Sequence, residues 1–141
     1  MHRSFSGCCG RLAPSPTGAL HLGNARSFLL AWLSARSKQG RVVLRIEDLD
    51  HPKVKRDASR QAMDDLRWMG LDWDEGPDIG GVHAPYIQTD RISLYENALH
   101  LLMQKGIVYP CACSRRDVES AQSAPHAGDD GPPYAGTCRG R

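Results

Sequence analysis

The sequence predicts an α/β domain with parallel strands. Along the chain, segments with the alternating apolar and polar residues of a strand are followed by segments in which apolar residues recur at helical spacing. The chain has 141 residues, of which 40% are hydrophobic, and this is enough for one domain with a packed core. In sheets of this kind ligands bind at the carboxyl ends of the strands, so we expect functional residues there.

Two strands frame the first helix. About five residues ending at Ala13 form the first strand, and residues 14–18 (PSPTG) form a loop because two prolines exclude a helix. The helix that follows ends near Gly40, and its apolar face is expected to contain Ala25, Phe28, Leu29, Trp32 and Leu33. Residues 41–48 form the clearest strand, and alternate residues face the core, namely Val42, Leu44 and Ile46.

Two more helices and a short strand complete the predicted elements. A helix over residues 57–69 has an inward stripe of Ala58, Ala62, Leu66 and Met69. Residues 71–88 are rich in Asp, Gly and Pro and are predicted to form a loop. A helix over residues 90–105 is expected to turn inward Ile92, Tyr95, Leu99 and Leu102. A strand over residues 107–109 follows, and the chain from Ser114 onward is polar.

Composition excludes several classes of protein. The net charge of +2, from 18 Lys and Arg against 16 Asp and Glu, excludes both a strongly basic chain and an acidic tail. No apolar run approaches the roughly 20 residues of a transmembrane helix, and no signal region is present. Five cysteines without an export signal argue against a disulfide framework. We expect a cytoplasmic protein without a membrane partner, in which Cys8 and Cys9 are buried strand residues.

A candidate phosphate site follows the first strand. His21, Gly23 and Asn24 stand where a Pro/Gly loop leads into a helix, and a helix N-terminus offers free N–H groups and a positive dipole end. Gly23 lets a base or a phosphate approach the backbone closely. His21 can donate a hydrogen bond to a phosphoryl oxygen as its negative charge increases. On this motif alone, an ordinary loop with a surface histidine is the alternative.

Longer segments of the chain resemble one enzyme family. Residues 11–24, RLAPSPTGALHLGN, resemble the first signature of the class I aminoacyl-tRNA synthetases, in the version of the glutamyl and glutaminyl enzymes. Residues 45–50, RIEDLD, resemble the second conserved block of that family. Residues 70–81 and 86–117 resemble the segments that follow, so that the resemblance extends over about residues 10–141. It implies a Rossmann-like catalytic domain.

The resemblance implies a glutamate pocket. Arg11, Ala13 and Ser15 would line it, and Arg11 would bind a substrate carboxylate, since a guanidinium group can bind a carboxylate through two hydrogen bonds. Glu47 would take the substrate ammonium group. Its side chain is expected to share a strand face with Arg45, away from the apolar face.

The same resemblance implies how ATP is bound. ATP, with Mg²⁺, would contact His21, Gly23 and Asn24, and His21 and Asn24 are the expected catalytic residues. For Asp48 and Asp50, which follow the strand, we favour the interpretation as cap or turn residues over a functional one.

Three cysteines near the end of the chain offer donors for a metal. Cys111 and Cys113 form a C-x-C pair, Cys138 follows 25 residues after Cys113, and Tyr134 precedes it by four. Three thiolates and one more donor can bind zinc tetrahedrally, although on spacing alone reduced free cysteines are an equal alternative. The pattern CxC and YxGTCR resembles the zinc site of the glutamyl-Q tRNA(Asp) synthetases, in which a tyrosine is the fourth ligand. It implies a structural Zn²⁺ bound by these four residues.

Two regions are therefore expected. Residues 1–110 would be the N-terminal half of the nucleotide-binding catalytic domain, and residues 111–141 a zinc-binding insertion. Within the insertion, we interpret His126 as a solvated loop residue. Basic residues flank the zinc ligands and could contact tRNA phosphates or form a solvated face, namely Arg115, Arg116, Arg139 and Arg141.

The implied function is the ATP-dependent activation of glutamate to glutamyl-adenylate and its transfer to the queuosine base of tRNA(Asp) by a monomeric enzyme. A truncated ordinary glutamyl-tRNA synthetase is the first alternative, and a non-catalytic zinc- and tRNA-binding fragment is the second. The chain contains no KMSKS-like lysine loop, which is the second ATP signature of the family. We therefore expect the 141 residues to be inactive or weakly active by themselves.

Overall fold

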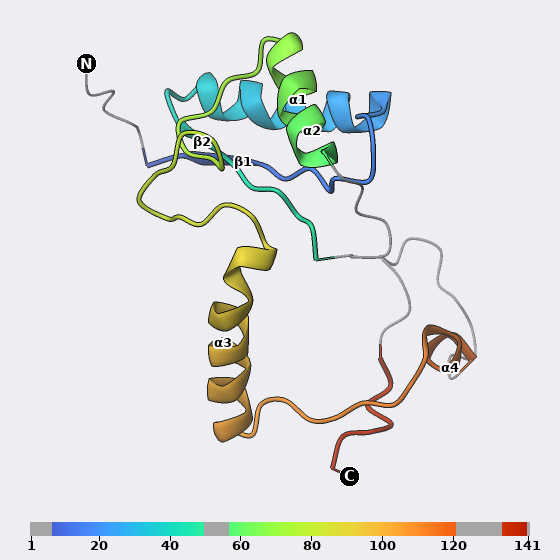
Figure 1. The fold of residues 1–141 in the computed structure, drawn as a ribbon. Coiled ribbons are helices and arrows are strands. Elements are labelled where there is room, and N and C mark those ends of the chain that lie inside the picture. Colours follow the sequence, from blue (N-terminus) through green and yellow to red (C-terminus); the bar gives the residue numbers. More distant parts are fainter. Residues whose placement is uncertain (1–6, 50–56, 121–133, 141) are drawn as a thin grey trace. The chain divides into compact units, whose positions relative to one another are not determined.

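The computed structural model describes residues 7–49, 57–120 and 134–140. The chain divides into two compact units, Met1–Ser93 and Leu94–Arg141. Its elements in chain order are β1 (Cys9–Leu12), α1 (Leu22–Arg36), β2 (Arg41–Leu44), α2 (Ala58–Trp68), the 3-10 turn η2 (Thr89–Arg91), α3 (Ile92–Gln104) and α4 (Arg115–Ser120) (Figure 1). The strand–helix–strand–helix order of the first unit confirms the predicted α/β class.

The two strands pair in parallel, as predicted. Leu12 of β1 lies opposite Leu44 of β2, and α1 forms the connection between the strands. The extended pairing continues beyond the assigned ends, because the amide of Glu47 donates to the carbonyl of Pro14 at 3.0 Å. The strand expected over residues 41–48 is therefore extended for most of its length, and it brings Glu47 beside the loop that follows β1.

The segment predicted as a loop over residues 71–88 covers the other edge of β2. Glu75 forms a parallel bridge with Val43, and Ile87 forms one with Ile46. An edge strand has unpaired N–H and C=O groups that can pair with another chain. Within the described residues, β1 and β2 form a two-stranded sheet, and the isolated bridge to Glu75 covers part of the other edge of β2. The bridge between Ile46 and Ile87 lies just beyond the end of β2.

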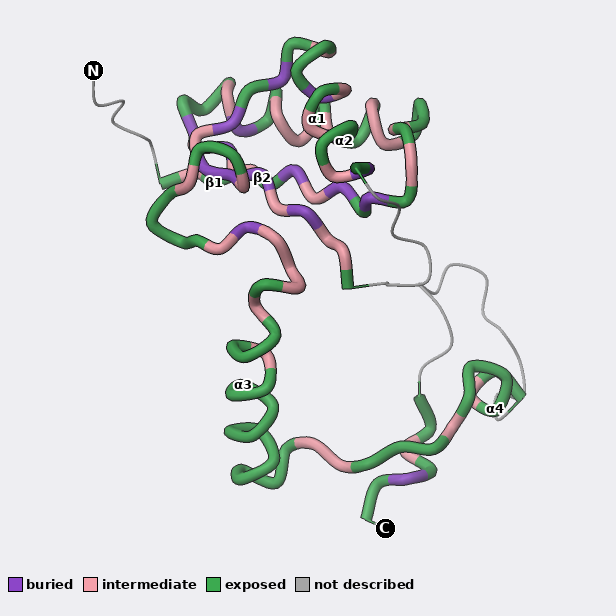
Figure 2. Tube along the Cα trace, in the orientation of Figure 1, coloured by how far each residue is buried: buried purple, intermediate pink, exposed green. Residues whose placement is uncertain are grey.

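Both helices of the first unit pack on one hydrophobic cluster. Its buried members come from the two strands, from α1, from α2 and from the loop after α2, and they are Leu12, Ala35, Val42, Leu44, Leu66, Leu71 and Trp73. Buried stretches follow the strands, whereas the helices expose much of their surface (Figure 2). The predicted inward positions of the second strand and of α2 are confirmed, with at most 3% exposure at Val42, Leu44, Ile46, Ala58, Ala62 and Leu66. The fourth predicted position of the helix, Met69, follows α2 and is only partly buried against the cluster.

One buried carboxylate links the strands to the loop that covers β2. Among the described residues, Glu75 is the one buried charged side chain, at 5% exposure. Its Oε1 lies 2.5 Å from the guanidinium of Arg41, and its Oε2 accepts a hydrogen bond from the hydroxyl of Tyr86. Burial, and next the hydrogen bond to Glu75, raise the pKa of Tyr86, which favours the phenol as the donor. A Cβ at Gly81 would lie 2.6 Å from Cγ of Glu75, so the cluster leaves no room for a side chain there.

Replacing Glu75 with leucine is expected to lower the free energy of unfolding by about 2 to 4 kcal/mol, because Arg41 and Tyr86 would lose their shared acceptor. Urea denaturation followed by tryptophan fluorescence measures this change. Arg60→Ala on the exposed surface of α2 is the control, and it should change the free energy by no more than about 0.5 kcal/mol. A Glu75→Leu variant as stable as that control would contradict the role given to the cluster.

The predicted strand over residues 107–109 is wrong, because these residues are neither strand nor helix. The amide of Ile107 instead donates to the carbonyl of Leu102 at 3.1 Å and closes the last turn of α3. The inward face predicted for α3 also differs from the structure, since this helix has no buried residue and Leu99 is 49% exposed. Its periodicity marks an apolar face, of which Tyr95 is of intermediate exposure and Ile92 and Leu102 are exposed.

The helix α4 was not predicted, although a sequence signal for it exists. The amide and hydroxyl of Ser114 donate to Oδ2 of Asp117 at 2.7 and 2.6 Å, and the amide of Asp117 donates back to Oγ of Ser114 at 3.2 Å. These reciprocal bonds follow the pattern of a capping box. The hydrogen bonds from the Ser114 side chain and backbone lower the pKa of Asp117 and favour its charged, accepting form. The spacing S-x-x-D was therefore the overlooked signal.

The expectation that Cys8 and Cys9 are buried is also wrong. Cys9 is exposed, and Cys8 is of intermediate exposure. Successive residues of a strand point to opposite faces, so the burial of Leu12 places Cys9 on the same face as the exposed Arg11. Among the described residues, no helix combines the length and the apolar character that a bilayer crossing requires.

Candidate functional site

The loop after β1 is fixed by its two prolines. Pro14 and Pro16 are fully buried, and the carbonyl of Pro14 accepts the hydrogen bond from the amide of Glu47. Ser15, between them, is exposed, and Ala13 is of intermediate exposure. The loop therefore presents Ser15 on the surface where β1 and the extension of β2 end. This is the position at which a parallel sheet binds its ligands.

Glu47 lies between two guanidinium groups. Its Oε1 is 2.5 Å from Arg45 and 3.9 Å from Arg11. The side chain of Glu47 is 27% exposed and that of Arg11 is 57% exposed, so both can be reached from solvent. The structure confirms that Arg45 and Glu47 share a strand face, and it brings Arg11 and Glu47 together. A ligand with both an ammonium group and a carboxylate would find a partner for each.

His21 is the N-cap of α1. Its Nδ1 accepts hydrogen bonds from the amides of Gly23 at 3.1 Å and Asn24 at 3.3 Å. The amide of His21 in turn donates to Oδ1 of Asn24 at 3.4 Å, which completes a reciprocal capping box. Since Nδ1 is an acceptor, the proton of the neutral imidazole resides on Nε2. The structure thus joins the three predicted ATP-contacting residues in one hydrogen-bonded unit.

This unit changes the expected mode of phosphate binding. The sequence predicted free N–H groups at this helix N-terminus, but the imidazole of His21 occupies the amides of Gly23 and Asn24. His21 is itself exposed, so its Nε2–H group is a donor that a ligand can reach at this end of α1. Because Nδ1 lies on the positive end of the helix dipole, the helix holds the imidazole in the tautomer that can donate to a phosphoryl oxygen.

Gly23 lies in close contact with the imidazole of His21. A Cβ at Gly23 would lie 3.0 Å from Cε1 and 3.1 Å from Nδ1 of His21. A side chain there must therefore displace the ring. A contact within the chain therefore favours glycine at this position, in addition to the open approach for a ligand that the sequence suggested.

Replacing Gly23 with alanine is expected to lower the rate of any reaction that uses His21 by about tenfold, because a small displacement of a catalytic group can cost that much. The same change should leave stability equal or raise it by up to about 1 kcal/mol, since alanine is the better helix former. The rate of ATP–pyrophosphate exchange and thermal unfolding measure the two effects. A loss of stability in parallel with the loss of rate would show that the helix, not the ring, is disturbed.

Asp48 has a structural partner. Its Oδ1 accepts a hydrogen bond from the amide of Thr89 at 2.9 Å, and its Oδ2 accepts one from the hydroxyl of the same residue at 2.6 Å. Asp48 therefore caps the turn η2, in line with the interpretation as a cap residue. Asp50, His126 and Arg141 lie outside the described residues.

The four predicted zinc ligands converge in the second unit. The sulfur atoms of Cys111, Cys113 and Cys138 lie within 4.8 Å of one another, and those of Cys113 and Cys138 are 3.5 Å apart. The hydroxyl of Tyr134 lies 3.4 Å from the sulfur of Cys111 and 3.9 Å from that of Cys113. A tetrahedral zinc with bonds of about 2.3 Å to sulfur would hold its sulfur ligands about 3.8 Å apart. The donor set therefore fits Zn²⁺.

Hydrogen bonds within this cluster lower the pKa of one member and raise the pKa of two others. The hydrogen bond from Tyr134, together with bonds from Ala112 and Cys113, lowers the pKa of Cys138 to about 6. The contacts with Cys111 and then Cys138 raise the pKa of Tyr134, and the contact with Cys138 raises that of Cys113. The cluster thus favours one thiolate, with its neighbours as donors. A bound divalent cation would reverse this pattern, because metal ligands bind in their deprotonated forms.

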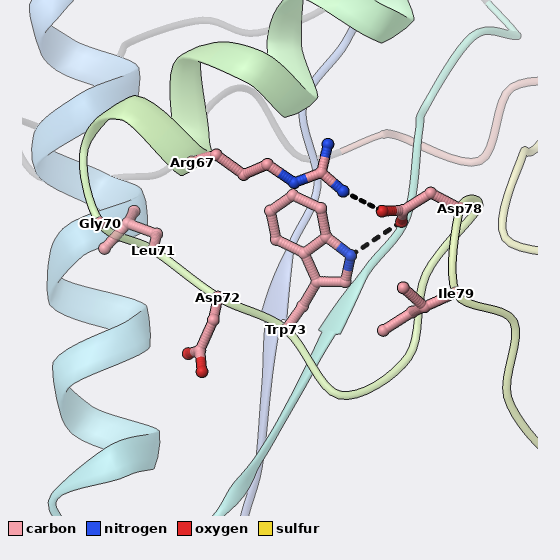
Figure 3. Close-up of a pocket in the computed structure, with 7 residues that line it drawn as sticks. All are labelled: Arg67, Gly70, Leu71, Asp72, Trp73, Asp78 and Ile79. Atoms are coloured by element: carbon pink, nitrogen blue, oxygen red, sulfur yellow. Dashed lines mark hydrogen bonds and ion pairs between the residues drawn. The ribbon is translucent and has the colours of Figure 1, made fainter.

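A pocket of about 380 Å³ lies elsewhere in the first unit, at the end of α2 (Figure 3). Residues of α2 and of the loop that follows line it, namely Arg67, Gly70, Leu71, Asp72, Trp73, Asp78 and Ile79. Asp78 accepts hydrogen bonds from Arg67 and from the indole of Trp73, and the guanidinium of Arg67 lies 4.9 Å from the indole centroid (Figure 3). None of the predicted site residues lines this pocket, and its Arg67, Trp73 and Asp78 pair with one another, so we interpret it as structural.

Comparison with known proteins identifies the family. Residues 9–139 match the family model described as "tRNA synthetases class I (E and Q), catalytic domain". The chain belongs to this family. The match confirms the resemblance found in residues 11–24 and 45–50, and with it the prediction of the N-terminal part of a class I synthetase catalytic domain.

Individual members of the class I synthetase family are similar over nearly the whole chain. A glutamyl-Q tRNA(Asp) synthetase of Symbiobacterium thermophilum is 57% identical over 132 residues, which are 93% of this chain and 41% of that protein. Glutamate–tRNA ligase 1 of Halorhodospira halophila is 50% identical over 128 residues, which are 91% of this chain and 27% of that protein. The chain thus spans well under half the length of either relative.

A solved structure shares the fold. The glutamate tRNA ligase from Elizabethkingia meningosepticum, in complex with its amino acid, matches with a TM-score of 0.71 and 33% sequence identity. The match covers 82% of this class I synthetase chain and 23% of the ligase. The chain therefore has the fold of the corresponding part of a glutamate tRNA ligase.

Proposed function

We propose that this chain is the N-terminal part of an enzyme that activates glutamate with ATP and transfers the glutamyl group to the queuosine base of tRNA(Asp). The relative with 57% identity is named for this activity, whereas a glutamate–tRNA ligase has 50%. Within the proposal, residues 1–110 are the first half of the catalytic domain and residues 111–141 are the zinc-binding insertion. The proposed substrates are glutamate, tRNA(Asp), and ATP bound with Mg²⁺, whose charge would offset that of the phosphates.

The observation that carries the proposal is the position of Tyr134. Its hydroxyl lies between the sulfur atoms of Cys111 and Cys113 and also accepts the amide hydrogen bond of Cys138 at 2.8 Å. A tyrosine among three cysteines is the ligand pattern by which the sequence resembles the glutamyl-Q enzymes. Zinc bound there would hold together two ends of a polar segment that has little apolar surface to bury.

The first step of the proposed mechanism is the binding of glutamate. Arg11 would bind a substrate carboxylate through its guanidinium, and Glu47 would accept the substrate ammonium group. In the free protein, Arg45 lies 2.5 Å from Oε1 of Glu47 and holds this carboxylate in place. Ala13 and Ser15 line the same end of β1, and their small side chains leave room for a ligand.

The second step is the formation of glutamyl-adenylate. An oxygen of the α-carboxylate forms a bond to the α-phosphorus of ATP, and the bond from that phosphorus to the bridging oxygen of pyrophosphate breaks. Negative charge increases on the phosphoryl oxygens during this step. His21 would stabilise this charge through Nε2–H, while Gly23 and Asn24 hold Nδ1. The glutamyl group is then transferred to the base, which releases AMP.

The ordinary glutamyl-tRNA synthetase is the alternative, and the 50% identity to glutamate–tRNA ligase 1 of Halorhodospira halophila supports it. The two proposals differ in the acceptor of the glutamyl group. They differ also in whether tRNA is needed for the first step, because the family resemblance implies that ordinary glutamyl enzymes need tRNA and that the glutamyl-Q group does not.

Glutamate-dependent ATP–pyrophosphate exchange without tRNA is the first test. We expect exchange in an active protein that contains this segment, and little or none with the 141 residues by themselves. Transfer of labelled glutamate to tRNA(Asp) that carries queuosine, with none to tRNA(Glu), is the expected second result. The control is tRNA(Asp) that carries guanosine in place of queuosine, which should accept no glutamate. Transfer to tRNA(Glu) would instead identify the ordinary synthetase.

A further inference from the structure

Asp65 of α2 reaches the loop that leads into His21. Its Oδ2 accepts a hydrogen bond from the amide of Leu20 at 3.1 Å, across 45 positions of sequence, and the contact is partly buried. Leu20 directly precedes His21, which is the N-cap of α1. We propose that Asp65 is a positioning residue that holds the backbone in front of His21 and thereby fixes the orientation of the imidazole.

Two contacts hold Leu20 in place. Its side chain packs against the hydrophobic cluster of the first unit, and its amide is bound by Asp65. The next residue, His21, enters α1 in an extended conformation with φ −92° and ψ 167°. The two contacts fix the peptide of Leu20, and this peptide sets the direction in which the backbone enters His21. Loss of either contact would therefore let the N-cap residue rotate. The bonds from Gly23 and Asn24 to Nδ1 depend on that orientation.

The neighbourhood of Asp65 explains why this residue can fill the role. Asp65 stands three positions after the buried Ala62 and next to the buried Leu66, so α2 directs it toward the core side. Asp64 has the same side chain one position earlier, but it is 63% exposed and pairs only distantly, at 3.8 Å, with Arg67. A carboxylate near a phosphate site repels phosphate, and this argues against direct ATP binding by Asp65.

The first experiment tests the geometry alone and uses the 141-residue chain. The ¹⁵N chemical shifts of the His21 ring report whether Nδ1 or Nε2 carries the proton. We expect the wild-type chain to show the Nε2–H tautomer. Asp65→Ala should shift the ring toward a mixture of tautomers, whereas Asp65→Asn should retain the wild-type signals because its amide oxygen can still accept from Leu20. Asp64→Ala is the matched control and should also retain them.

The second experiment tests the consequence for catalysis, and this part rests on the proposed function. In an active protein that contains this segment, Asp65→Ala should lower kcat of ATP–pyrophosphate exchange about tenfold, with little change in KM for glutamate. In a His21→Ala background the same change should have no further effect, because Asp65 acts through His21. Asp65→Asn should restore kcat to within about twofold of the wild type.

Two results would overturn the proposal. Wild-type ring shifts in a folded Asp65→Ala chain would show that the imidazole does not depend on this contact. A tenfold loss of kcat that persists in the His21→Ala background would show that Asp65 acts elsewhere. If Asp65→Ala does not fold, Asp65→Glu replaces it, because the longer side chain displaces the carboxylate by one methylene. The same ¹⁵N ring shifts of His21 then show whether the tautomer depends on this contact. Absence of exchange in the wild type would refute the proposed function and leave the ring measurement valid.

Discussion

Replacing Cys138 with serine is expected to weaken strongly the zinc binding proposed for the second unit. Cys138 is the buried member of the cluster, its sulfur lies 3.5 Å from that of Cys113, and its amide is bound by the hydroxyl of Tyr134. The substitution removes a thiolate ligand, whereas the backbone amide at this position can still donate to the hydroxyl of Tyr134. We expect the zinc dissociation constant to rise by more than about 100-fold, since contacts one shell further out already contribute 10- to 100-fold.

Metal content by mass spectrometry and competition with a chromogenic chelator measure this effect. The wild-type chain should hold one zinc ion, and Tyr134→Phe should bind zinc more weakly than the wild type but more tightly than Cys138→Ser. Cys9→Ser is the control, because Cys9 is an exposed thiol of β1 outside the cluster. Equal zinc content in the wild type and in Cys138→Ser would refute the assignment of the ligands.

Replacing His21 with alanine is expected to lower kcat of ATP–pyrophosphate exchange by about 100- to 1,000-fold in an active protein that contains this segment, which is the usual effect of removing a donor to transition-state charge. The same change removes the acceptor for the amides of Gly23 and Asn24. It should therefore also lower the free energy of unfolding by about 1 kcal/mol, the usual effect of losing an N-cap.

His21→Asn separates these two effects. Asparagine is among the preferred N-cap residues, so this variant should recover most of the lost stability. It has no group that takes the place of Nε2–H, so the rate should stay as low as in His21→Ala. If His21→Asn regains stability while its ATP–pyrophosphate exchange stays slow, the imidazole has a role in catalysis. Recovery of the rate together with the stability would show that His21 serves only as a cap.

Local patterns were sufficient for the two strands and for α2, but not for the inward face of α1, where the predicted Leu29 and Leu33 are 40% and 47% exposed. The alternation at residues 41–48 gave both the strand and its buried face, because one side of that strand packs on the hydrophobic cluster. The inward stripe of α2 followed from helical periodicity for the same reason. Periodicity failed at residues 107–109 because a strand requires a partner, and the amide of Ile107 closes α3 instead.

Contacts between distant segments could not be predicted in this way. Nothing near Glu75 indicates that its carboxylate lies between Arg41 and Tyr86, because that contact depends on how the loop over residues 71–88 covers β2. The same holds for Asp65, whose partner Leu20 is 45 positions away. The positions of His21 and Asn24 at the start of a helix were predicted from the residue pattern, but the occupation of the helix amides by Nδ1 required the structure.

The cluster of Cys111, Cys113, Tyr134 and Cys138 also has a consequence for chain length. Its donors come in two pairs, one before and one after the residues between Cys113 and Tyr134. The contact between the two pairs closes this part of the chain into a loop. The entropy of closing a flexible loop changes slowly with its length, by about 0.6 kcal/mol for each doubling. An insertion between the two pairs of donors, such as a peptide tag or a fluorescent label, is therefore expected to change the proposed zinc affinity little, which competition with a chelator measures.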